Sequence, residues 1–322
     1  MVAGVVLPKP RFLLVSVFRG EPVTALVLAS SLSNFTAYMA AAISEGSIVA
    51  LAALGFLLTH KATGVISFAQ GALVTLGAYI AIWASRTEGW PLLLSYLFAI
   101  VAMFFVGVAS ERIAYRPLRG RSVHVVVIAT FGISLIIEVI IGLWQGTQPK
   151  GLSPLWAGHF ELFGAVIPYQ RVLILVVTLL TVAAMVALFT RTQFGRQVRA
   201  VAADRETAQL YGVPVGRLSI LSFGIAGSLA GLAGVLIAPV GSVDLGFGFL
   251  IMLGGFYAAI VGGFGSLGGV VVGGFLIGFV QYVVGSYWLT RYQSLWPFAL
   301  IIGIIAIKPT GLFTKGQSHG RL

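Results

Sequence analysis

The sequence predicts an all-α integral membrane protein: a polytopic bundle of about eight to ten transmembrane helices with one short helix on the cytoplasmic side. Only 9% of the 322 residues are charged, 58% are hydrophobic, and the mean hydropathy is +1.02. A soluble domain is about 25% charged, so this chain has too little polar surface to face water. Its apolar runs are continuous and often reach the roughly 20 residues of a spanning helix, whereas barrel strands alternate in polarity over about 10.

These runs follow one another along most of the chain. Each is predicted to be helical, because a helix pairs the backbone groups that lipid leaves unpaired. Leu245–Thr290 has no charged residue over 46 positions and is long enough for two spans, whereas Gly46–Thr59 is predicted to be a short helix or half of a broken one. The other predicted spans are Val23–Ile43, Ala62–Ser85, Gly89–Ser110, Ser122–Ile137 (running on to about Gln145), Val172–Thr190, Leu218–Val243 and Tyr292–Ile307.

Two arginine clusters predict the orientation, because short cytoplasmic loops collect Lys and Arg. Two predicted spans separate the clusters, so both lie on one side, with residues 146–170 outside and the C-terminal tail inside. This topology explains the net charge of +11 better than nucleic-acid binding does, since the basic residues occupy separate loops without an aromatic-studded surface. The clusters are Arg112, Arg116, Arg119 and Arg121, and Arg191, Arg196, Arg199, Arg205 and Arg217.

The outer segment 146–170 is the longest polar stretch between the termini. Within it, HFELFGAVIP (159–168) predicts a small hairpin around Gly164. A loop of this length is often functional, and a simple linker is the equally weighted alternative.

Residues 196–214 are unusually rich in charge for this apolar chain, with five Lys, Arg, Asp or Glu residues among nineteen positions. Strong helix formers predict a separate helix over Gln197–Leu210, detached from the preceding span at Thr192 and Gly195 and ended by Gly212 and Pro214. Ala200, Asp204, Ala208 and Gly212 recur every four residues as a small-residue stripe. Such a helix suits the membrane surface or a groove in a partner protein, and the stripe favours the close-packed partner.

Six segments together resemble the permease subunits of branched-chain amino-acid ABC importers, over roughly residues 44–313. The resemblance leaves residues 1–43 as an N-terminal segment with room for an extra transmembrane helix, and 314–322 as a cytoplasmic tail. The segments are GVISFAQGALVTLGAYIA (64–81), ERIAYRPLRGR (111–121), FGRQVRAVAADRETAQLYGVPVGRL (194–218), FGIAGSLAGLAGVLIAP (223–239), AIVGGFGSLGGVVVGGFLIG (259–278) and KPTGLF (308–313).

The resemblance implies that 195–212 holds the coupling helix, which sits in a cleft of an ATP-hydrolysing subunit. It further implies a second, different permease chain, two ATP-binding subunits that hold ATP and Mg, and an external solute-binding protein, in a bacterial or archaeal inner membrane with the C-terminus cytoplasmic. This chain is then not an enzyme and binds no cofactor. The expected ATPase-contact residues are Arg196, Arg199, Ala200, Asp204, Arg205, Glu206, Ala208 and Gly212.

A second set of residues is predicted to line the pathway or to pack helices together. The related family often has Asn and His where this chain has Ser67 and Gln70, so the motif does not identify the solute. Glycines four residues apart let membrane helices approach closely. The set is Ser67, Gln70, Gly71, Gly262, Gly263, Gly265, Ser266 and Gly269.

Ionisable residues within spans are functional candidates by default. Glu138 is the strongest of them, while Glu45 and Asp244 are expected at span ends facing water. No cysteine and no GxxxxGK[ST] loop occurs, which excludes thiol catalysis and the usual ATP cradle. The alternatives left open are an importer of urea, amides or aromatic acids, and an ion-coupled secondary transporter or channel, which needs buried acids that this chain scarcely has.

Overall fold

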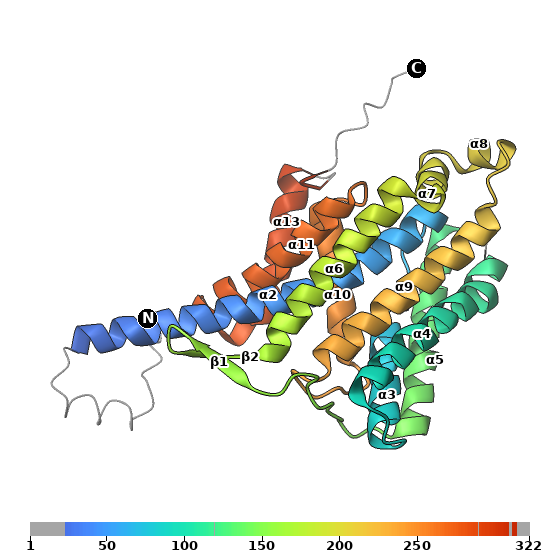
Figure 1. The fold of residues 1–322 in the computed structure, drawn as a ribbon. Helices are drawn as coiled ribbons and strands as arrows, with labels where there is room; N and C mark the ends of the chain where they lie inside the picture. The colour runs from blue at the N-terminus through green and yellow to red at the C-terminus, as the bar shows by residue number, and fades with distance from the viewer. Residues whose placement is uncertain (1–22, 119, 289, 309–310, 314–322) are drawn as a thin grey trace.

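The computed structural model describes residues 23–118, 120–288, 290–308 and 311–313; Arg119, the first 22 residues and the tail 314–322 lie outside the described residues. Its long helices run side by side as a bundle (Figure 1). The helices are α2 (Val23–Thr63), α3 (Gln70–Arg86), α4 (Leu92–Ser110), α5 (Val123–Gln145), α6 (Tyr169–Arg191), α7 (Gln193–Ala203), α8 (Arg205–Leu210), α9 (Val215–Ile237), α10 (Phe247–Gly262), α11 (Leu267–Phe279), α12 (Gly285–Tyr287) and α13 (Trp296–Ile307).

Short segments complete the chain. Two π-helices extend longer helices, η1 (Glu111–Tyr115) after α4 and η3 (Val280–Val284) after α11, and two 3₁₀ turns follow, η2 (Arg116–Leu118) and η4 (Thr290–Leu295). The strands β1 (His159–Leu162) and β2 (Ala165–Pro168) pair in antiparallel fashion, with Leu162 opposite Ala165. The hairpin predicted around Gly164 is therefore confirmed.

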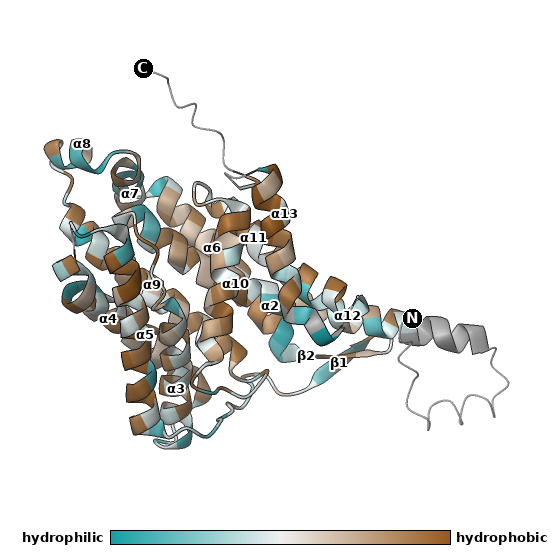
Figure 2. Cartoon of the chain, turned by 180° about the vertical axis from the view of Figure 1, so that it is seen from behind, coloured by the Kyte–Doolittle hydropathy of each residue, from teal (hydrophilic) through white to brown (hydrophobic). Residues whose placement is uncertain are grey.

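Within the described residues, six helices are long and apolar enough to cross a membrane, and two further apolar helices, α10 and α13, are shorter. The six are Ser31–Thr63, Leu92–Leu118, His124–Gln145, Tyr169–Arg191, Val215–Ile237 and Leu267–Tyr287. Brown apolar residues cover the sides of the bundle, and teal polar residues gather towards its ends (Figure 2). The chain is thus a multi-pass helical membrane protein.

Helix α2 differs from the prediction, because the run 23–43 and the short segment 46–59 form one unbroken helix. Its 41 residues measure about 60 Å, twice the hydrocarbon thickness, and its N-terminal end projects beyond the bundle (Figure 1). Gly46 does not end the helix, since it lies against the backbone of Phe275 on α11. The helix also crosses the predicted domain boundary at residue 43 without a break.

The core forms around α2, which packs against α6, α9, α10 and α11, and around α9, which packs against α3 and α4. Ile48, Leu51 and Phe56 of α2 are fully buried. Glycines set the helix spacing as predicted: a Cβ on Gly234 would lie 2.2 Å from the Val74 carbonyl oxygen, and one on Gly278 would lie 2.4 Å from that of Ala42. Small residues at these crossings therefore allow backbone contact between α9 and α3, and between α11 and α2.

The connection from α2 to α3 turns back into the bundle. The span predicted from Ala62 begins as a helix only at Gln70, which lies beside Gly55, two turns before the end of α2. Residues 64–69 are not helical, and Ser67 and Ala69 are buried. The backbone N–H of Phe68 donates to the Thr130 hydroxyl on α5 (3.1 Å). Such a segment is tolerated at membrane depth because it is buried in protein.

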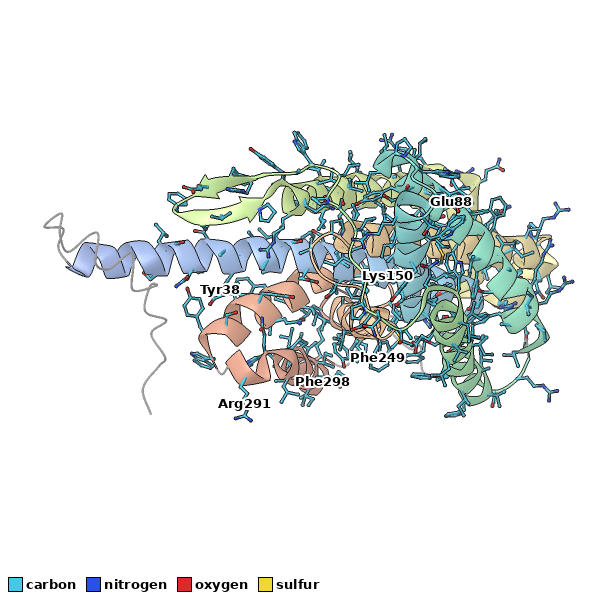
Figure 3. The ribbon with its side chains drawn as sticks, turned by 90° about the horizontal axis from the view of Figure 1, so that it is seen from below. Tyr38, Glu88, Lys150, Phe249, Arg291 and Phe298 are labelled. Atoms are coloured by element: carbon cyan, nitrogen blue, oxygen red, sulfur yellow. The ribbon has the colours of Figure 1, made fainter. Side chains whose placement is uncertain are left out.

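The bundle has two distinct ends. At one end, Arg116 and Arg217 line a common cavity, so the two arginine clusters share this end as predicted. At the other end, Lys150 and Val243 exchange backbone hydrogen bonds of 2.9 and 2.7 Å, and the β1–β2 hairpin lies along the outer part of α2 (Figure 3). We refer to these as the basic end and the hairpin end.

Candidate functional site

A sharp bend in the chain at the basic end separates α7 from the membrane helix α6. Thr192 leaves the helical conformation, and its hydroxyl accepts a hydrogen bond from the backbone N–H of Gly195 (3.2 Å). A Cβ on Gly195 would lie 2.3 Å from the Phe189 carbonyl oxygen, so only glycine allows the two helices to fold this closely. The predicted separation at Thr192 and Gly195 is confirmed, although α7 begins at Gln193 rather than at 197.

Helix α7 is held firmly against the bundle. Val198 and Val201 are buried, and α7 contacts α2, α6 and α9. The Arg199 guanidinium donates to the Phe189 carbonyl oxygen of α6 and lies near Lys61 at the end of α2. Helix α7 thus packs directly against α2, the central helix of the bundle, as well as against α6.

The single helix predicted over Gln197–Leu210 is wrong, because the chain breaks it at Asp204. Asp204 has extended backbone angles (φ −154°, ψ 112°), and its carboxylate accepts hydrogen bonds from the backbone N–H groups of Glu206 (3.0 Å) and Thr207 (3.1 Å). It thus caps the N-terminus of α8. The Thr207 hydroxyl also donates to this carboxylate and, as the largest cause, lowers the pKa of Asp204.

The break also removes the predicted small-residue stripe, since Ala200 and Ala208 belong to different helices. Of the predicted contact residues, Ala208 is buried and Arg205 is half-buried. The other predicted contact residues are exposed. They are Arg196, Arg199 and Ala200 on α7, Asp204 at the break, Glu206 on α8 and Gly212 after its end.

Helix α8 ends in an exposed apolar tip. Gly212 takes a left-handed backbone (φ +79°) and Val213 returns a hydrogen bond to the Ala208 carbonyl (3.0 Å), which turns the chain back towards α9. Leu210 and Tyr211 precede this turn and are 88% and 85% exposed. Figure 1 shows α8 at the far corner of the basic end. The predicted contact residues include neither Leu210 nor Tyr211, although their position just before a glycine cap was a usable signal.

The predicted glycine-rich residues of 262–269 form the turn between α10 and α11 at the basic end. Gly262 and Gly269 pack backbone to backbone, Gly263 has a positive φ, and Ser266 caps α11 through the Gly269 N–H (3.1 Å). The Lys61 ammonium donates to the Gly265 carbonyl (3.1 Å). From the other side, the Leu312 N–H donates to the Val261 carbonyl (2.9 Å), so the C-terminal segment also clamps this turn.

Ser67, Gln70 and Gly71 lie together inside the bundle, far from α8. The Gln70 amide, 1% exposed, donates to the Ala226 carbonyl of α9 (3.2 Å). Gly71 meets the backbone of Gly248 at the start of α10. Ser67 faces the Tyr115 hydroxyl. In this conformation all three act as packing contacts between helices.

The three candidate acids occupy different environments. Asp244 is exposed in the loop before α10, at a span end as predicted. Glu138 is half-buried on α5, where its carboxylate accepts from the Ser134 hydroxyl (3.4 Å). The position predicted for Glu45 is wrong: it lies within the α2 span, where it bonds the Tyr282 hydroxyl near Arg171. In the described part of the chain, no three His, Cys, Asp or Glu side chains gather as a metal site.

Comparison with known proteins identifies the family to which this chain belongs. Residues 38–305 match the family model described as "Branched-chain amino acid transport system / permease component". The chain is 32% identical to the high-affinity branched-chain amino acid transport system permease protein BraD of Pseudomonas aeruginosa, and 30% identical to LivH of Escherichia coli K12. Each alignment covers 85% of this chain and 94% of the relative.

An archaeal protein, the probable branched-chain amino acid transport permease LivH of Methanocaldococcus jannaschii, is 29% identical over 84% of this chain and 90% of its own length. No solved structure matches the chain. The family model spans most of the chain, and the matched region contains the α7–α8 elements as well as the membrane helices. The chain therefore belongs to the family of permease components of branched-chain amino acid transport systems.

Proposed function

We propose that this chain is one of two permease subunits of an ATP-binding-cassette importer and forms part of the pathway for branched-chain or related amino acids. The observation that carries the proposal is the exposed tip of α8, presented by a rigid α7 on a membrane-spanning bundle. Leu210 and Tyr211 are adjacent there and are 88% and 85% exposed at the basic end of the bundle. Tyrosine is enriched among residues that dominate binding energy at protein interfaces.

The mechanism follows from how α7 and α8 are attached. An ATPase subunit that binds α8 moves α7 together with α8. Helix α7 packs directly against α2 and α6, so these membrane helices move as well. Closure of the ATPase pair on ATP then favours one access state of the pathway, because the two states offer α8 different contacts. ATP and Mg are bound by those partner subunits in this scheme, and the present chain carries no catalytic group.

The remaining parts of the proposal concern place and partners. The basic end faces the cytoplasm of a bacterial or archaeal cell, in accordance with its arginines, and so does the C-terminal segment clamped on the α10–α11 turn. A second, different permease chain completes the pathway, and an external solute-binding protein docks at the hairpin end. The substrate class is taken from the printed names of the relatives; urea, amides and aromatic acids remain the alternatives within the same architecture.

Uptake by vesicles that contain the assembled transporter tests the proposal. Branched-chain amino acid uptake should require ATP on the α8 side, and Asp204→Lys or Arg199→Glu should abolish it while the protein still inserts. Normal transport by both variants, in complexes that still contain the ATPase, contradicts the assignment of α7–α8. Uptake driven by an ion gradient without ATP favours a secondary transporter instead.

A further inference from the structure

A cavity of about 230 Å³ opens at the basic end, apart from the tip of α8. It lies between the segment η1–η2 and the first turns of α9, which are about 100 residues apart in the sequence. Its lining comprises Glu111, Arg116, Gly216, Arg217 and Ile220. The transport mechanism described above uses none of these side chains.

The cavity lies at the boundary of the membrane. Its lining residues belong to the terminal turns of two candidate spans, Leu92–Leu118 and Val215–Ile237. One to two turns deeper, Phe105 on α4 and Leu221 on α9 are exposed apolar side chains. Charged residues thus line the cavity at the ends of both spans, and exposed apolar side chains occur one to two turns further along the same helices. This order of charged and apolar groups suits a phospholipid headgroup and its acyl chain.

The charge of the lining matches one phosphodiester. Arg116 and Arg217 supply two positive charges and Glu111 one negative charge, which leaves a net +1. Both arginines are exposed, whereas Glu111 is completely buried at the base. One guanidinium group can donate two parallel hydrogen bonds to two oxygens of a phosphate. Two arginines from different elements therefore suit a phosphate placed between them.

We propose that this cavity binds the phosphate of an anionic phospholipid headgroup. Basic pockets between transmembrane helices are a recurrent form of anionic-lipid site. A free phosphate ion satisfies the same arginines, but the adjoining apolar surface favours the lipid as the source. The proposal goes beyond the proposed function, because it needs only a membrane boundary at this end of the bundle.

Native mass spectrometry of the complete transporter, released from nanodiscs of mixed phosphatidylglycerol and phosphatidylcholine, tests it. We expect the wild type to retain phosphatidylglycerol selectively. R116Q/R217Q should lower this retention roughly 30-fold, since each basic residue contributes about fivefold in affinity for anionic lipid. R116K/R217K should retain an intermediate amount, because the charge remains but paired guanidinium contacts are lost.

Arg121→Gln is the matched control, since Arg121 is exposed in the same loop but does not line the cavity. It should retain phosphatidylglycerol like the wild type. Equal retention by R116Q/R217Q, or equal loss in Arg121→Gln, overturns the proposal. So does displacement of the lipid by millimolar inorganic phosphate, which identifies a site for soluble phosphate. Lipid retention is measured without transport, so its failure is distinguishable from failure of the coupling role.

Discussion

The side-chain amide of Gln70 donates a 3.2 Å hydrogen bond to the backbone carbonyl oxygen of Ala226, which joins the first turn of α3 to the middle of α9. The bond exists because Gly55 on α2 leaves room for it: a Cβ at Gly55 would lie 2.1 Å from the Gln70 amide nitrogen. Three helices therefore meet at one polar contact inside an apolar bundle. Interhelical bonds of this kind contribute about 0.6–1.7 kcal/mol in membranes.

Gly55→Ala should destabilise the permease by about 1–3 kcal/mol, because the added methyl overpacks a filled site and displaces the Gln70 amide. Thermal unfolding in one detergent measures this. Gly132→Ala on α5 is the matched control, since no heavy atom lies within 4 Å of a Cβ there, and helix propensity should make it neutral or stabilising by up to about 1 kcal/mol. Equal shifts in the two variants contradict the packing argument.

Loss of the Asp204 cap should loosen α8 alone. Asp204→Ala removes the acceptor for two backbone N–H groups, whereas Asp204→Asn keeps an oxygen in the same place. Hydrogen exchange of residues 205–210 should therefore quicken in the Ala variant and change little in the Asn variant. An unchanged exchange rate in Asp204→Ala shows that tertiary contacts, rather than the cap, hold α8.

The same cap should respond to acid. Because hydrogen bonds lower the pKa of Asp204 in the folded chain below its usual 3.8, its ionised carboxylate contributes stability that is complete above that value. This contribution is lost as the pH falls through the folded pKa. Exchange of α8 amides, corrected for the intrinsic rate, should stay constant from neutral pH to about 4 and rise only below it. A rise that begins near pH 6 assigns the effect to another group.

Truncation of the α8 tip should weaken partner binding without affecting the fold. Leu210 and Tyr211 are almost fully exposed, so Leu210→Ser and Tyr211→Ala remove little buried surface within this chain. Each should weaken binding of the ATPase subunit at least about tenfold, as truncation of a hot-spot residue does. Co-purification and thermal unfolding are measured together, with the exposed neighbour Gln209→Ala as control. Unchanged affinity in both tip variants would falsify the role of the tip.

Hydropathy predicted the membrane bundle, but not where helices begin and end within it. Ala62–Gln70 carries no charged residue and was therefore predicted as part of a span, whereas the non-helical course of 64–69 depends on contacts with Thr130 on α5 and Gly55 on α2. Conversely, α2 continues through Gly46 because Phe275 packs there and no local residue forces a break. Tertiary contacts decide both outcomes, and a one-dimensional pattern does not contain them.

The break at Asp204 is a different kind of error, because its signal was local. Helix formers flank Asp204 on both sides and predict one helix. Aspartate, however, prefers the N-cap over the helix interior, and Glu206 and Thr207 follow it in positions suited to a first turn. If the N-cap preference of Asp204 is given more weight than the helix propensity of its neighbours, the sequence predicts α8 as a separate helix. Glu45 was misplaced since its helix was predicted to end near residue 43.

Lys61 should restrain the α10–α11 turn through its bond to the Gly265 carbonyl. Lys61→Met keeps the apolar stem but removes the donor, so hydrogen exchange of residues 263–268 should quicken while α9 stays protected. Lys61→Arg keeps a donor and should preserve the protection. The C-terminal clamp at Leu312 also holds this turn, so the expected effect is partial. No change in Lys61→Met assigns the restraint to that clamp alone.

The tip of the β1–β2 hairpin carries an unusual residue for its backbone. Leu162 pairs with Ala165, so Phe163 and Gly164 form a two-residue loop, and both have positive φ (50° and 79°). Such loops prefer Asn-Gly, because a bulky residue in the left-handed region costs about 1–2 kcal/mol. Phe163 recovers little of this cost by packing, as it is 66% exposed.

Phe163→Asn should therefore stabilise the hairpin by up to about 1 kcal/mol. Hydrogen exchange of the Leu162 and Ala165 amides, which flank the two-residue loop as its hydrogen-bonded pair, measures this locally. Phe163→Val is the control, because a β-branched side chain tolerates positive φ poorly, and it should destabilise the hairpin. Should Phe163→Asn lower protection in the assembled transporter but raise it in the isolated permease, the Phe163 ring contacts a partner subunit, and its exposed position at the hairpin end is then explained by that interface.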